Sequence, residues 1–337
     1  MKKLLSVLLA ALMIFTLAGC GNKGGEETGA KTVKVGVSIY KFDDTFMTNY
    51  RNEIDAYFKT KNTDAVTYQV DIMDGKNDMA EQTNQIDNFI TQGYDVLILN
   101  LVQSSAAQTI VDKCAAAGIP CVFINREPAE DVMKSHADDY AGKFCYVGAD
   151  ARQSGKMQGE IIADLADKGD LNGDGTLQYI MIEGDPENVD AQYRTEFSIS
   201  QYKEVTGMPV ECLVDQVGNW NRDEGETIAA NALTQFGDKI EVIFANNDDM
   251  ADGALTAIKA AGRTVGTDIY LVGVDANDYA VADVLEGTFT GTVLNDAKGQ
   301  SHAAVDCAIK AANGEALDSY YWVDYVKVTA ANAADYQ

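Results

Sequence analysis

The sequence is poor in basic residues and in the side chains that most enzymes use for catalysis. It has 26 Lys and Arg against 52 Asp and Glu, a formal net charge of −26, and only two histidines. A chain this acidic is repelled by nucleic acid and by anionic lipid, so neither is an expected partner. It also lacks a G-x-S-x-G, an H-E-x-x-H, a P-loop and a G-x-G-x-x-G after a strand. We therefore expect no catalytic residue, and a protein that binds rather than converts its ligand.

Cysteines are few and widely spaced after the N-terminal region. Five follow Cys20, namely Cys114, Cys121, Cys145, Cys212 and Cys307. The odd number and the mostly apolar neighbourhoods favour buried thiols over a disulfide framework, although one pair remains open as an alternative.

The one long apolar run lies at the N-terminus. Lys2 and Lys3 precede the run from Leu4 to Leu17, which ends in Leu-Ala-Gly-Cys20. A basic start and a short apolar stretch are typical of an export signal, here residues 1–20, rather than of a spanning helix. The ending resembles a bacterial lipobox, so Cys20 is the expected lipidated residue, with a plain signal peptide as the alternative. Residues 21–32 are glycine-rich and polar, which predicts a flexible tether.

Apolar β-branched runs alternate with helical patterns through the rest of the chain. Strands are expected over 33–40, 68–73, 96–101, 120–125, 178–183, 211–216, 242–246 and 269–275, with another beginning near Phe144. Helices are expected over 47–59, 79–92, 106–117, 152–168, 191–205, 222–236 and 249–261. This alternation is typical of parallel sheets covered on both faces, and the length allows two domains. The sequence predicts an α/β fold of two doubly wound lobes with a ligand cleft between them.

The segment 239–255, KIEVIFANNDDMADGAL, shows how such a cleft is formed. An apolar run breaks into Asn246, Asn247, Asp248 and Asp249 before a helical pattern begins. In open α/β sheets ligands bind beyond the carboxyl ends of strands, so these side chains are candidates for recognition. Helix capping by Asp248 or Asp249 is the alternative.

Other strand ends carry similar planar polar groups. The candidates are Asp44, Asn100, Asn247, Asp275 and Asn295, together with Asp190 and Arg194 after the strand at 178–183. Their fixed donors and acceptors suit a ligand with many hydroxyl groups. Phe46 and Trp220 also follow strand ends, where flat rings suit the apolar faces of a pyranose. A single Asn or Asp is more often a helix cap, and a single Phe or Trp is more often a core residue, but the set as a whole favours a sugar site.

Residues 170–178, DLNGDGTLQ, have the spacing of a calcium-binding loop. Oxygen-bearing side chains stand at positions 1, 3, 5 and 9 with glycine at position 6, as in an EF-hand. Position 12, however, is Met181 instead of glutamate, and a strand follows where a helix is usual. Either a carboxylate from elsewhere completes a Ca²⁺ site, or the segment is an Asx-rich turn.

Several segments resemble, in collinear order, the glucose/galactose-binding proteins of the type I periplasmic binding protein family. They are YKFDDTFM (40–47), NLV (100–102), YVGAD (146–150), DLNGDGTLQ (170–178), GDPENVDAQYR (184–194), IEVIFANNDDMADGA (240–254), GVDA (273–276) and GTVLNDA (291–297). The resemblance implies two lobes joined by a hinge of three segments near Phe144, Leu294 and Tyr320. The N-terminal lobe would comprise 33–144 plus 296–320, and the C-terminal lobe 145–294 plus 321–337, with the calcium loop.

The resemblance also implies residue roles. Hydrogen bonds to the sugar would come from Asp44, Asn100, Asp190, Arg194, Asn247, Asp275 and Asn295, with Phe46 and Trp220 against the ring. Asn188, the tenth expected sugar contact, stands where the family has a sugar-binding histidine. Its amide can still donate a hydrogen bond, but the sugar preference is open. A structural Ca²⁺ would be held by Asp170, Asn172, Asp174, Gln178, the carbonyl of Thr176, and Glu241 as the missing carboxylate.

The function that these features imply is transport. A monomeric lipoprotein on the outer face of the cell membrane, periplasmic in a Gram-negative cell, would capture D-galactose, D-glucose or methyl-galactoside between its lobes. It would deliver the sugar to the permease and ATPase of an ABC importer, because contacts from both lobes exist together only in the closed state. The alternatives are reporting a sugar to a chemoreceptor or sensor kinase, and serving an importer for another monosaccharide.

Overall fold

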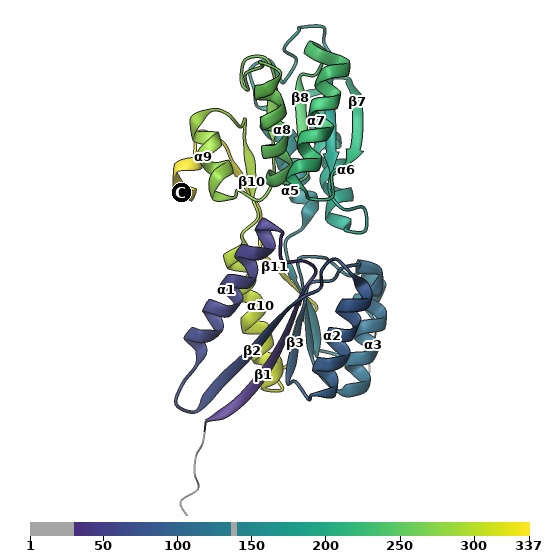
Figure 1. Ribbon diagram of the computed structural model, residues 1–337, viewed down its shortest axis with the longest axis vertical. Coiled ribbons are helices and arrows are strands. Elements are labelled where there is room, and N and C mark those ends of the chain that lie inside the picture. Colours follow the sequence, from purple (N-terminus) through teal and green to yellow (C-terminus); the bar gives the residue numbers. More distant parts are fainter. Residues whose placement is uncertain (1–29, 136–139) are drawn as a thin grey trace, which may run out of the picture.

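The structure, a computed structural model, describes residues 30–135 and 140–337. The expected signal peptide, Cys20 and most of the expected tether lie outside these ranges. The described chain forms two lobes stacked along the long axis (Figure 1). No helix within the described ranges is both long and apolar enough to cross a membrane.

The N-terminal lobe is built on a parallel six-stranded sheet of order β11-β5-β4-β3-β1-β2. Its strands are β1 (Lys31–Ile39), β2 (Val66–Asp74), β3 (Val96–Leu99), β4 (Cys121–Ile124), β5 (Phe144–Gly148) and β11 (Tyr320–Trp322). Helices α1 (Thr45–Lys61) and α10 (Ala297–Ala312) cover one face, and α2 (Met79–Thr91) and α3 (Ala107–Ala117) the other (Figure 1). The short helices η1 (Ser104–Ala106) and α4 (Glu130–Met133) lie in loops.

The C-terminal lobe repeats this plan around a parallel four-stranded sheet of order β7-β6-β8-β9. Its strands are β6 (Leu177–Glu183), β7 (Val210–Val217), β8 (Val242–Ala245) and β9 (Tyr270–Val272), beside the antiparallel pair β10 (Thr292–Leu294) and β12 (Val326–Val328). Helices α5 (Ala151–Ala163) and α6 (Val189–Thr206) cover one face, and α7 (Arg222–Phe236), α8 (Asp248–Ala260) and α9 (Asp278–Glu286) the other. The short helices are η2 (Gly237–Lys239) and η3 (Ala333–Tyr336).

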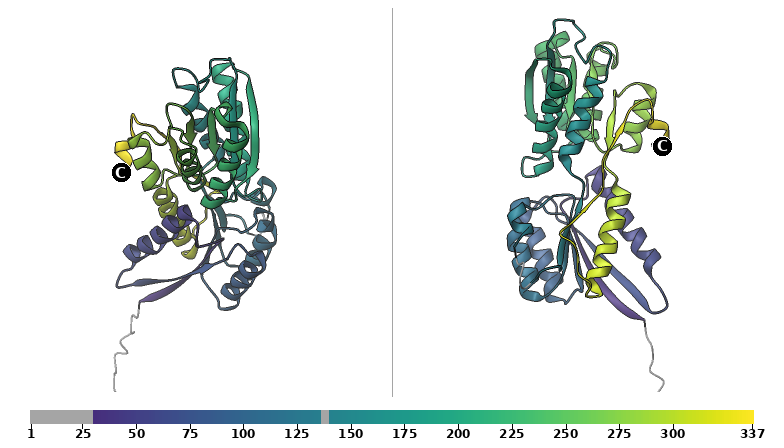
Figure 2. Two further views of the ribbon diagram at one scale, coloured as in Figure 1. Left: turned by 45° about the horizontal axis from the view of Figure 1, so that its top comes forward. Right: turned by 180° about the vertical axis from the view of Figure 1, so that it is seen from behind.

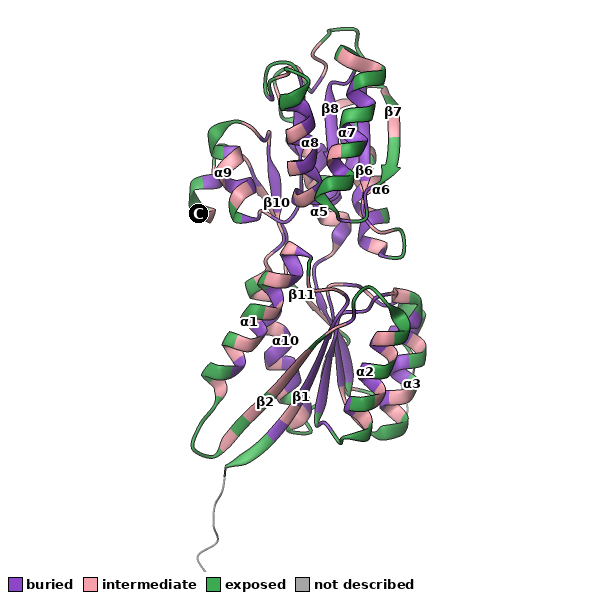
Figure 3. Cartoon of the chain, in the orientation of Figure 1, coloured by how far each residue is buried: buried purple, intermediate pink, exposed green. Residues whose placement is uncertain are grey.

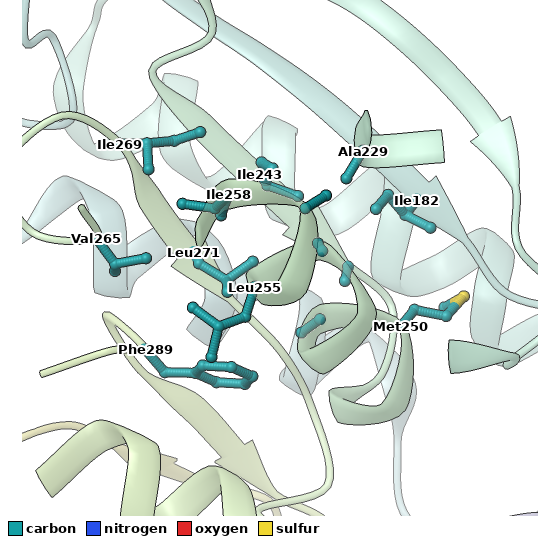
Figure 4. Close-up of a cluster of buried hydrophobic side chains, with 14 of the residues drawn as sticks. Ile182, Ala229, Ile243, Met250, Leu255, Ile258, Val265, Ile269, Leu271 and Phe289 are labelled. Atoms are coloured by element: carbon teal, nitrogen blue, oxygen red, sulfur yellow. The ribbon is translucent and has the colours of Figure 1, made fainter. Parts of the chain in front are cut away.

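The central strands are apolar along their whole length because helices cover both of their faces. All four residues of β8 are buried, and the same holds for β3 and β4 (Figure 3). In the C-terminal lobe, Ile243 of β8 belongs to the same apolar cluster as Leu255 and Ile258 of α8 (Figure 4). This packing determines where each strand ends, and therefore where the polar residues that directly follow the strand lie.

Two of the three crossings between the lobes come later in the chain than the family resemblance implies, and the third lies at Leu294 as expected. Strand β5 pairs with β4, and β11 pairs with β5, so both belong to the N-terminal sheet. The crossings thus follow Gly148, Leu294 and Trp322, and the yellow C-terminal segment returns to the upper lobe (Figure 2). The expected boundaries at 144/145 and 320/321 cut into these two strands. Strand β1 likewise begins at Lys31, inside the expected tether.

The cysteines of the described chain form no disulfide. Four are buried, as expected, and Cys212 on β7 is exposed. The sequence pattern missed this exception because β7 is an edge strand with much of one side in solvent.

Candidate functional site

A cavity lies between the lobes at the carboxyl ends of the strands. The space inside it that is open to the centre of a water-sized molecule is about 30 Å³, so the cavity is narrow. Its lining from the N-terminal lobe is Tyr40, Asp44, Phe46, Met47, Asn125 and Arg126. From the C-terminal lobe and the hinge come Asn188, Asp190, Arg194, Trp220, Asn247, Asp275 and Asn295. Nine of the ten residues expected to bind sugar are in this set, and Asn100 is the exception.

Three of the polar lining residues are also helix N-caps. Asp44 accepts from the Met47 N–H at 2.7 Å and caps α1, while Asn188 accepts from the Asp190 N–H at 3.0 Å and caps α6. Asn247 caps α8 in the same way. Capping and cavity lining are therefore compatible, because the cap bond uses one side-chain oxygen and leaves the amide nitrogens of Asn188 and Asn247 for a ligand, while Oδ2 of Asp44 accepts from the Tyr40 hydroxyl at 2.6 Å.

The alternative interpretation, that Asp248 or Asp249 caps the helix, is wrong, because Asn247 is the N-cap of α8. Asp248 is fully buried inside α8 and accepts from the Thr292 hydroxyl at 2.6 Å and from the Asn277 N–H at 2.9 Å. Asp249 accepts from the Thr45 hydroxyl at 3.0 Å, a hydrogen bond that spans the two lobes. Neither residue lines the cavity.

Arg194 is the charged centre of the C-terminal wall. Its Nη1 donates to the Asn246 carbonyl at 2.7 Å, and its Nη2 donates to the Tyr325 hydroxyl at 3.1 Å on the third crossing. The carboxylates of Asp190 and Asp275 each lie 3.9 Å from the guanidinium. Burial raises the pKa of Asp190 to about 6 and holds the pKa of Asp275 well above its usual range, while Arg194 opposes both shifts.

The two expected ring-stacking residues come from opposite lobes. Phe46 lies in the first turn of α1, and Trp220 lies in the turn after β7. Each is 7% exposed and lines the cavity. Aromatic faces on both lobes can meet a flat ring only when the lobes are together.

Three of the eight non-glycine residues with positive φ in the described chain line this cavity. Asn125, Trp220 and Asp275 have φ values of 61°, 61° and 123°, a region that residues with a Cβ rarely adopt. Each such residue costs of order 1–3 kcal/mol, which the surrounding packing must offset. All three line the cavity, so the fold holds these side chains in positions that relaxed turns would not give.

Asn100 is placed behind the cavity wall and not in it. Its Oδ1 accepts from the Tyr40 N–H at 3.1 Å, and its Nδ2 donates to Asn125 Oδ1 at 3.0 Å. It is fully buried. The expected ligand contact is therefore corrected to a positioning role, in which Asn100 ties together the loops after β1 and β4.

Four lining residues were not expected, namely Tyr40, Met47, Asn125 and Arg126. Asn125 and Arg126 directly follow β4. The argument that polar residues after a strand are candidates for ligand binding, which predicted the other polar residues of the site, therefore applies to them as well. Met47 has no such signal, because it falls on the buried face of α1.

The expected calcium loop lies against Glu241, as the resemblance implies. The Asn172 N–H donates to Glu241 Oε1 and the Gln178 N–H to Oε2, each at 2.9 Å. Asp170 accepts from the N–H groups of Gly173 and Gly175 at 2.8 and 2.9 Å. Burial raises the pKa of Glu241.

The loop carboxylates face backbone N–H groups and not one another. Within residues 30–135 and 140–337, no three His, Cys, Asp or Glu side chains are grouped closely enough to hold a metal. The set of oxygen donors is nevertheless of the kind that Ca²⁺ takes, because carboxylates, amide oxygens and a carbonyl are all hard ligands.

Comparisons with known proteins agree with this architecture. Residues 35–316 match the sequence profile of the periplasmic binding protein domain. The D-galactose/methyl-galactoside binding periplasmic protein of Haemophilus influenzae is 34% identical over 316 residues, covering 90% of this chain and 91% of that protein. A Rhizobium meliloti protein named for rhizopine binding is 33% identical over 338 residues, covering 100% of this chain and 99% of that one.

A solved structure extends the comparison to a bound ligand. An ABC transporter solute binding protein from Bacillus halodurans, with bound myo-inositol, has a TM-score of 0.77 at 31% identity. The alignment covers 93% of this chain and 99% of that one.

Proposed function

Because the chain belongs to the periplasmic binding protein family, we propose that its interlobe cavity takes a neutral, six-membered, polyhydroxylated ring. At the level of the family, the protein is an extracytoplasmic solute-binding protein for a sugar or polyol, it works with an ABC transporter, and it is not an enzyme. The ring is D-galactose or D-glucose, with methyl-galactoside as a close relative. The observation that carries this choice is the pair of aromatic side chains, Phe46 and Trp220, facing the cavity from opposite lobes.

The charges of the lining support a neutral ligand. Three carboxylates, from Asp44, Asp190 and Asp275, meet two guanidinium groups, from Arg126 and Arg194. The site has no excess positive charge, so a phosphorylated or carboxylated sugar would enter an unfavourable field. Hydroxyl groups both donate and accept, and they can satisfy the lining amides, carboxylates and guanidinium groups together.

A second candidate is myo-inositol, for two reasons. Asn188 replaces the histidine that glucose/galactose-binding proteins use, so the expected sugar contact is changed at one position. The solved relative at 31% identity holds myo-inositol, which is also a six-membered ring bearing hydroxyls.

We also propose the attachment and partners expected from the N-terminal sequence. Cys20 carries the lipid, the residues between Cys20 and β1 tether the lobes to the membrane, and the closed monomer docks on the permease of its importer. Delivery to a chemoreceptor or sensor kinase is the alternative, and the identity of the neighbouring genes separates the two.

Calcium is the proposed structural cofactor. The side chains of Asp170, Asn172, Asp174, Gln178 and Glu241, with the carbonyl of Thr176, would hold it. The support is that Glu241, 63 residues from Gln178 in sequence, already accepts N–H groups from this loop. The ion would add an electrostatic tie between the loop and the start of β8.

Thermal unfolding of residues 31–337 with added ligands tests the function. A ligand that binds only the folded state raises the melting temperature, by an amount set by RT ln(1 + [L]/Kd). We expect a clear rise with D-galactose or D-glucose, and none with galactose 1-phosphate or galacturonate. A rise with myo-inositol alone would select the second candidate. A rise only with ribose or arabinose would contradict a hexose or myo-inositol as the ligand.

Gly184 provides a test of Trp220. A Cβ on Gly184 would lie 2.1 Å from the Trp220 ring, far inside contact distance. Gly184→Ala must therefore displace the ring, and overpacking of this kind costs about 1–3 kcal/mol, so we expect affinity to fall about 10-fold. Isothermal titration calorimetry of Gly184→Ala and wild type with D-galactose and myo-inositol measures this change in affinity.

The control is Gly36→Ala in the N-terminal core. Its Cβ would lie 2.7 Å from the Phe89 ring, away from the cavity. This variant should lose stability and keep its affinity, which separates general destabilisation from displacement of Trp220. Equal affinity of Gly184→Ala and wild type would show that Trp220 does not touch the ligand.

A further inference from the structure

A hydrogen bond between the lobes lies outside the ligand cavity. It joins Thr45, the first residue of α1 in the N-terminal lobe, to Asp249 in the first turn of α8 in the C-terminal lobe. The Thr45 hydroxyl donates to Asp249 Oδ1 at 3.0 Å. Neither residue lines the cavity, although Thr45 stands between Asp44 and Phe46, which both do. The bond therefore links the lobes beside the ligand site without using a group that lines it.

The Asp249 carboxylate is held in place from its own lobe. The Tyr279 hydroxyl, in the first turn of α9, donates to the same Oδ1 atom at 2.6 Å, and Asn277 Nδ2 donates to the Tyr279 hydroxyl at 3.3 Å. The Tyr279 ring packs against the apolar core of the C-terminal lobe. Burial raises the pKa of Asp249, and the hydrogen bonds from Tyr279 and Thr45 oppose this shift because they favour the charged form. The C-terminal lobe thus positions the acceptor to which the other lobe brings Thr45.

The partner segment in the N-terminal lobe suits a carboxylate. Thr45 begins a helix of 17 residues, and the end of α1 that carries it points toward the C-terminal lobe (Figure 1). The N-terminus of a helix has unpaired N–H groups and a partial positive charge, so a negatively charged side chain is favoured there. Asp249 therefore attracts this end of α1 electrostatically as well as through the Thr45 hydroxyl.

We infer that Asp249 is a positioning residue for lobe closure, which stabilises the closed state through Thr45 whichever ligand is bound. The inference rests on the proposed function, because a bound solute is what brings the lobes together. A contact that stabilises the closed state without touching the ligand raises the affinity for every ligand by the same factor. It forms after the ligand has entered, so it slows dissociation and leaves the association rate nearly unchanged. The cavity residues select the ring, and Asp249 sets how tightly an accepted ring is held.

Thr45→Val and Asp249→Ala, singly and together, test the inference. Each variant is titrated by calorimetry with D-galactose, D-glucose, methyl-galactoside and myo-inositol, and stopped-flow tryptophan fluorescence gives the rates. If wild type binds only one of these solutes, its monodeoxy derivatives replace the others. We expect each single variant to weaken binding of every accepted solute by about 10-fold, through faster dissociation, with the ratios of the affinities unchanged. The double variant should lose no more than the weaker single variant, because both substitutions remove the same bond.

Thr48→Val and Thr45→Ser are the matched controls. Thr48 lies three residues further along α1, and its hydroxyl donates to the Phe42 carbonyl at 3.0 Å within the N-terminal lobe. Thr48→Val removes a hydrogen bond of the same length that does not cross the cleft, so its affinity should stay within about twofold of wild type. Thr45→Ser keeps the hydroxyl and should recover most of the affinity that Thr45→Val loses. Thermal unfolding without ligand checks the folding of each variant, and the Thr45 variants suffice if Asp249→Ala is unstable.

The contrary results are distinct. Wild-type affinity in Thr45→Val would show that the bond does not stabilise closure. A loss that differs strongly between solutes would mean that the pair acts on ligand selection, and additive losses in the double variant would mean that the two residues act separately. Either result would overturn the inference while the proposed function stands. If wild type binds none of the four solutes, the proposed function itself fails, and the inference fails with it.

Discussion

Arg194→Met is expected to weaken ligand binding by about 100-fold or more and to lower the stability of the protein. Arg194 is 3% exposed and lies between Asp190 and Asp275, each 3.9 Å away. Removing one partner from a buried charge cluster costs about 3–5 kcal/mol, because the remaining carboxylates stay buried without a counter-ion. The variant also loses the hydrogen bond to Tyr325, which ties the C-terminal wall to the hinge. Calorimetry and urea unfolding measure the two effects.

Arg152→Met is the matched control. Arg152 pairs with Asp150 at 2.9 Å, but their side chains are 36% and 45% exposed. An ion pair this exposed contributes about 0–1 kcal/mol, so stability should change little and affinity should be within a few fold of wild type. An Arg194→Met variant that also kept its affinity within a few fold would show that the guanidinium is not part of the ligand site.

Removing calcium is expected to lower the melting temperature by roughly 5–10 °C without a large change in ligand affinity. An ion at 100 times its Kd stabilises the folded state by about 2.7 kcal/mol, and a domain of this size shifts by about 2–4 °C per kcal/mol. The loop lies at the opposite end of β8 from Asn247, since Glu241 precedes the strand and Asn247 follows it. Thermal unfolding is compared in excess Ca²⁺ and in EGTA, with ligand titrations in both.

Two variants make the calcium experiment specific. Glu241→Gln should abolish the difference between Ca²⁺ and EGTA, because it removes the one carboxylate supplied from outside the loop. Asp238→Asn, an exposed acid three residues earlier, should leave that difference intact. Identical melting curves for wild type with and without chelator would leave the segment as an Asx-rich turn.

The sequence by itself determined the elements of the fold and most of the cavity. Buried parallel strands need apolar β-branched runs, and parallel connections need helices between them, so the alternation is visible in the chain. The carboxyl ends of parallel strands lie at one edge of the sheet, so the side chains that directly follow these strands gather at that edge. This is why the sequence alone, with the family resemblance, predicts Asp44, Asn188, Asp190, Asn247 and Asp275 as site residues, and why they all line the cavity.

Tertiary structure decided which strand belongs to which sheet. The residues of β5 and β11 do not reveal which strand each one pairs with, so the boundaries implied by the family resemblance fall inside these two strands. Tertiary structure also decided what each polar side chain faces. Asn100 directly follows a strand, as the other polar site residues do, yet its side chain forms hydrogen bonds with Tyr40 and Asn125 instead of lining the cavity.

The pairing of Arg126 with Asp185 shows the limit most clearly. The two residues lie 59 positions apart and on different lobes, and each alone is an ordinary charged residue after a strand. Only the packing of Arg126 on Tyr40 and the approach of the second lobe bring them together. Local sequence encodes where a strand ends, because that depends on the chain's own burial pattern. Which groups then meet across the cleft depends on how the two sheets are placed relative to each other. Only the tertiary structure determines that placement, because it depends on contacts between residues far apart in the sequence.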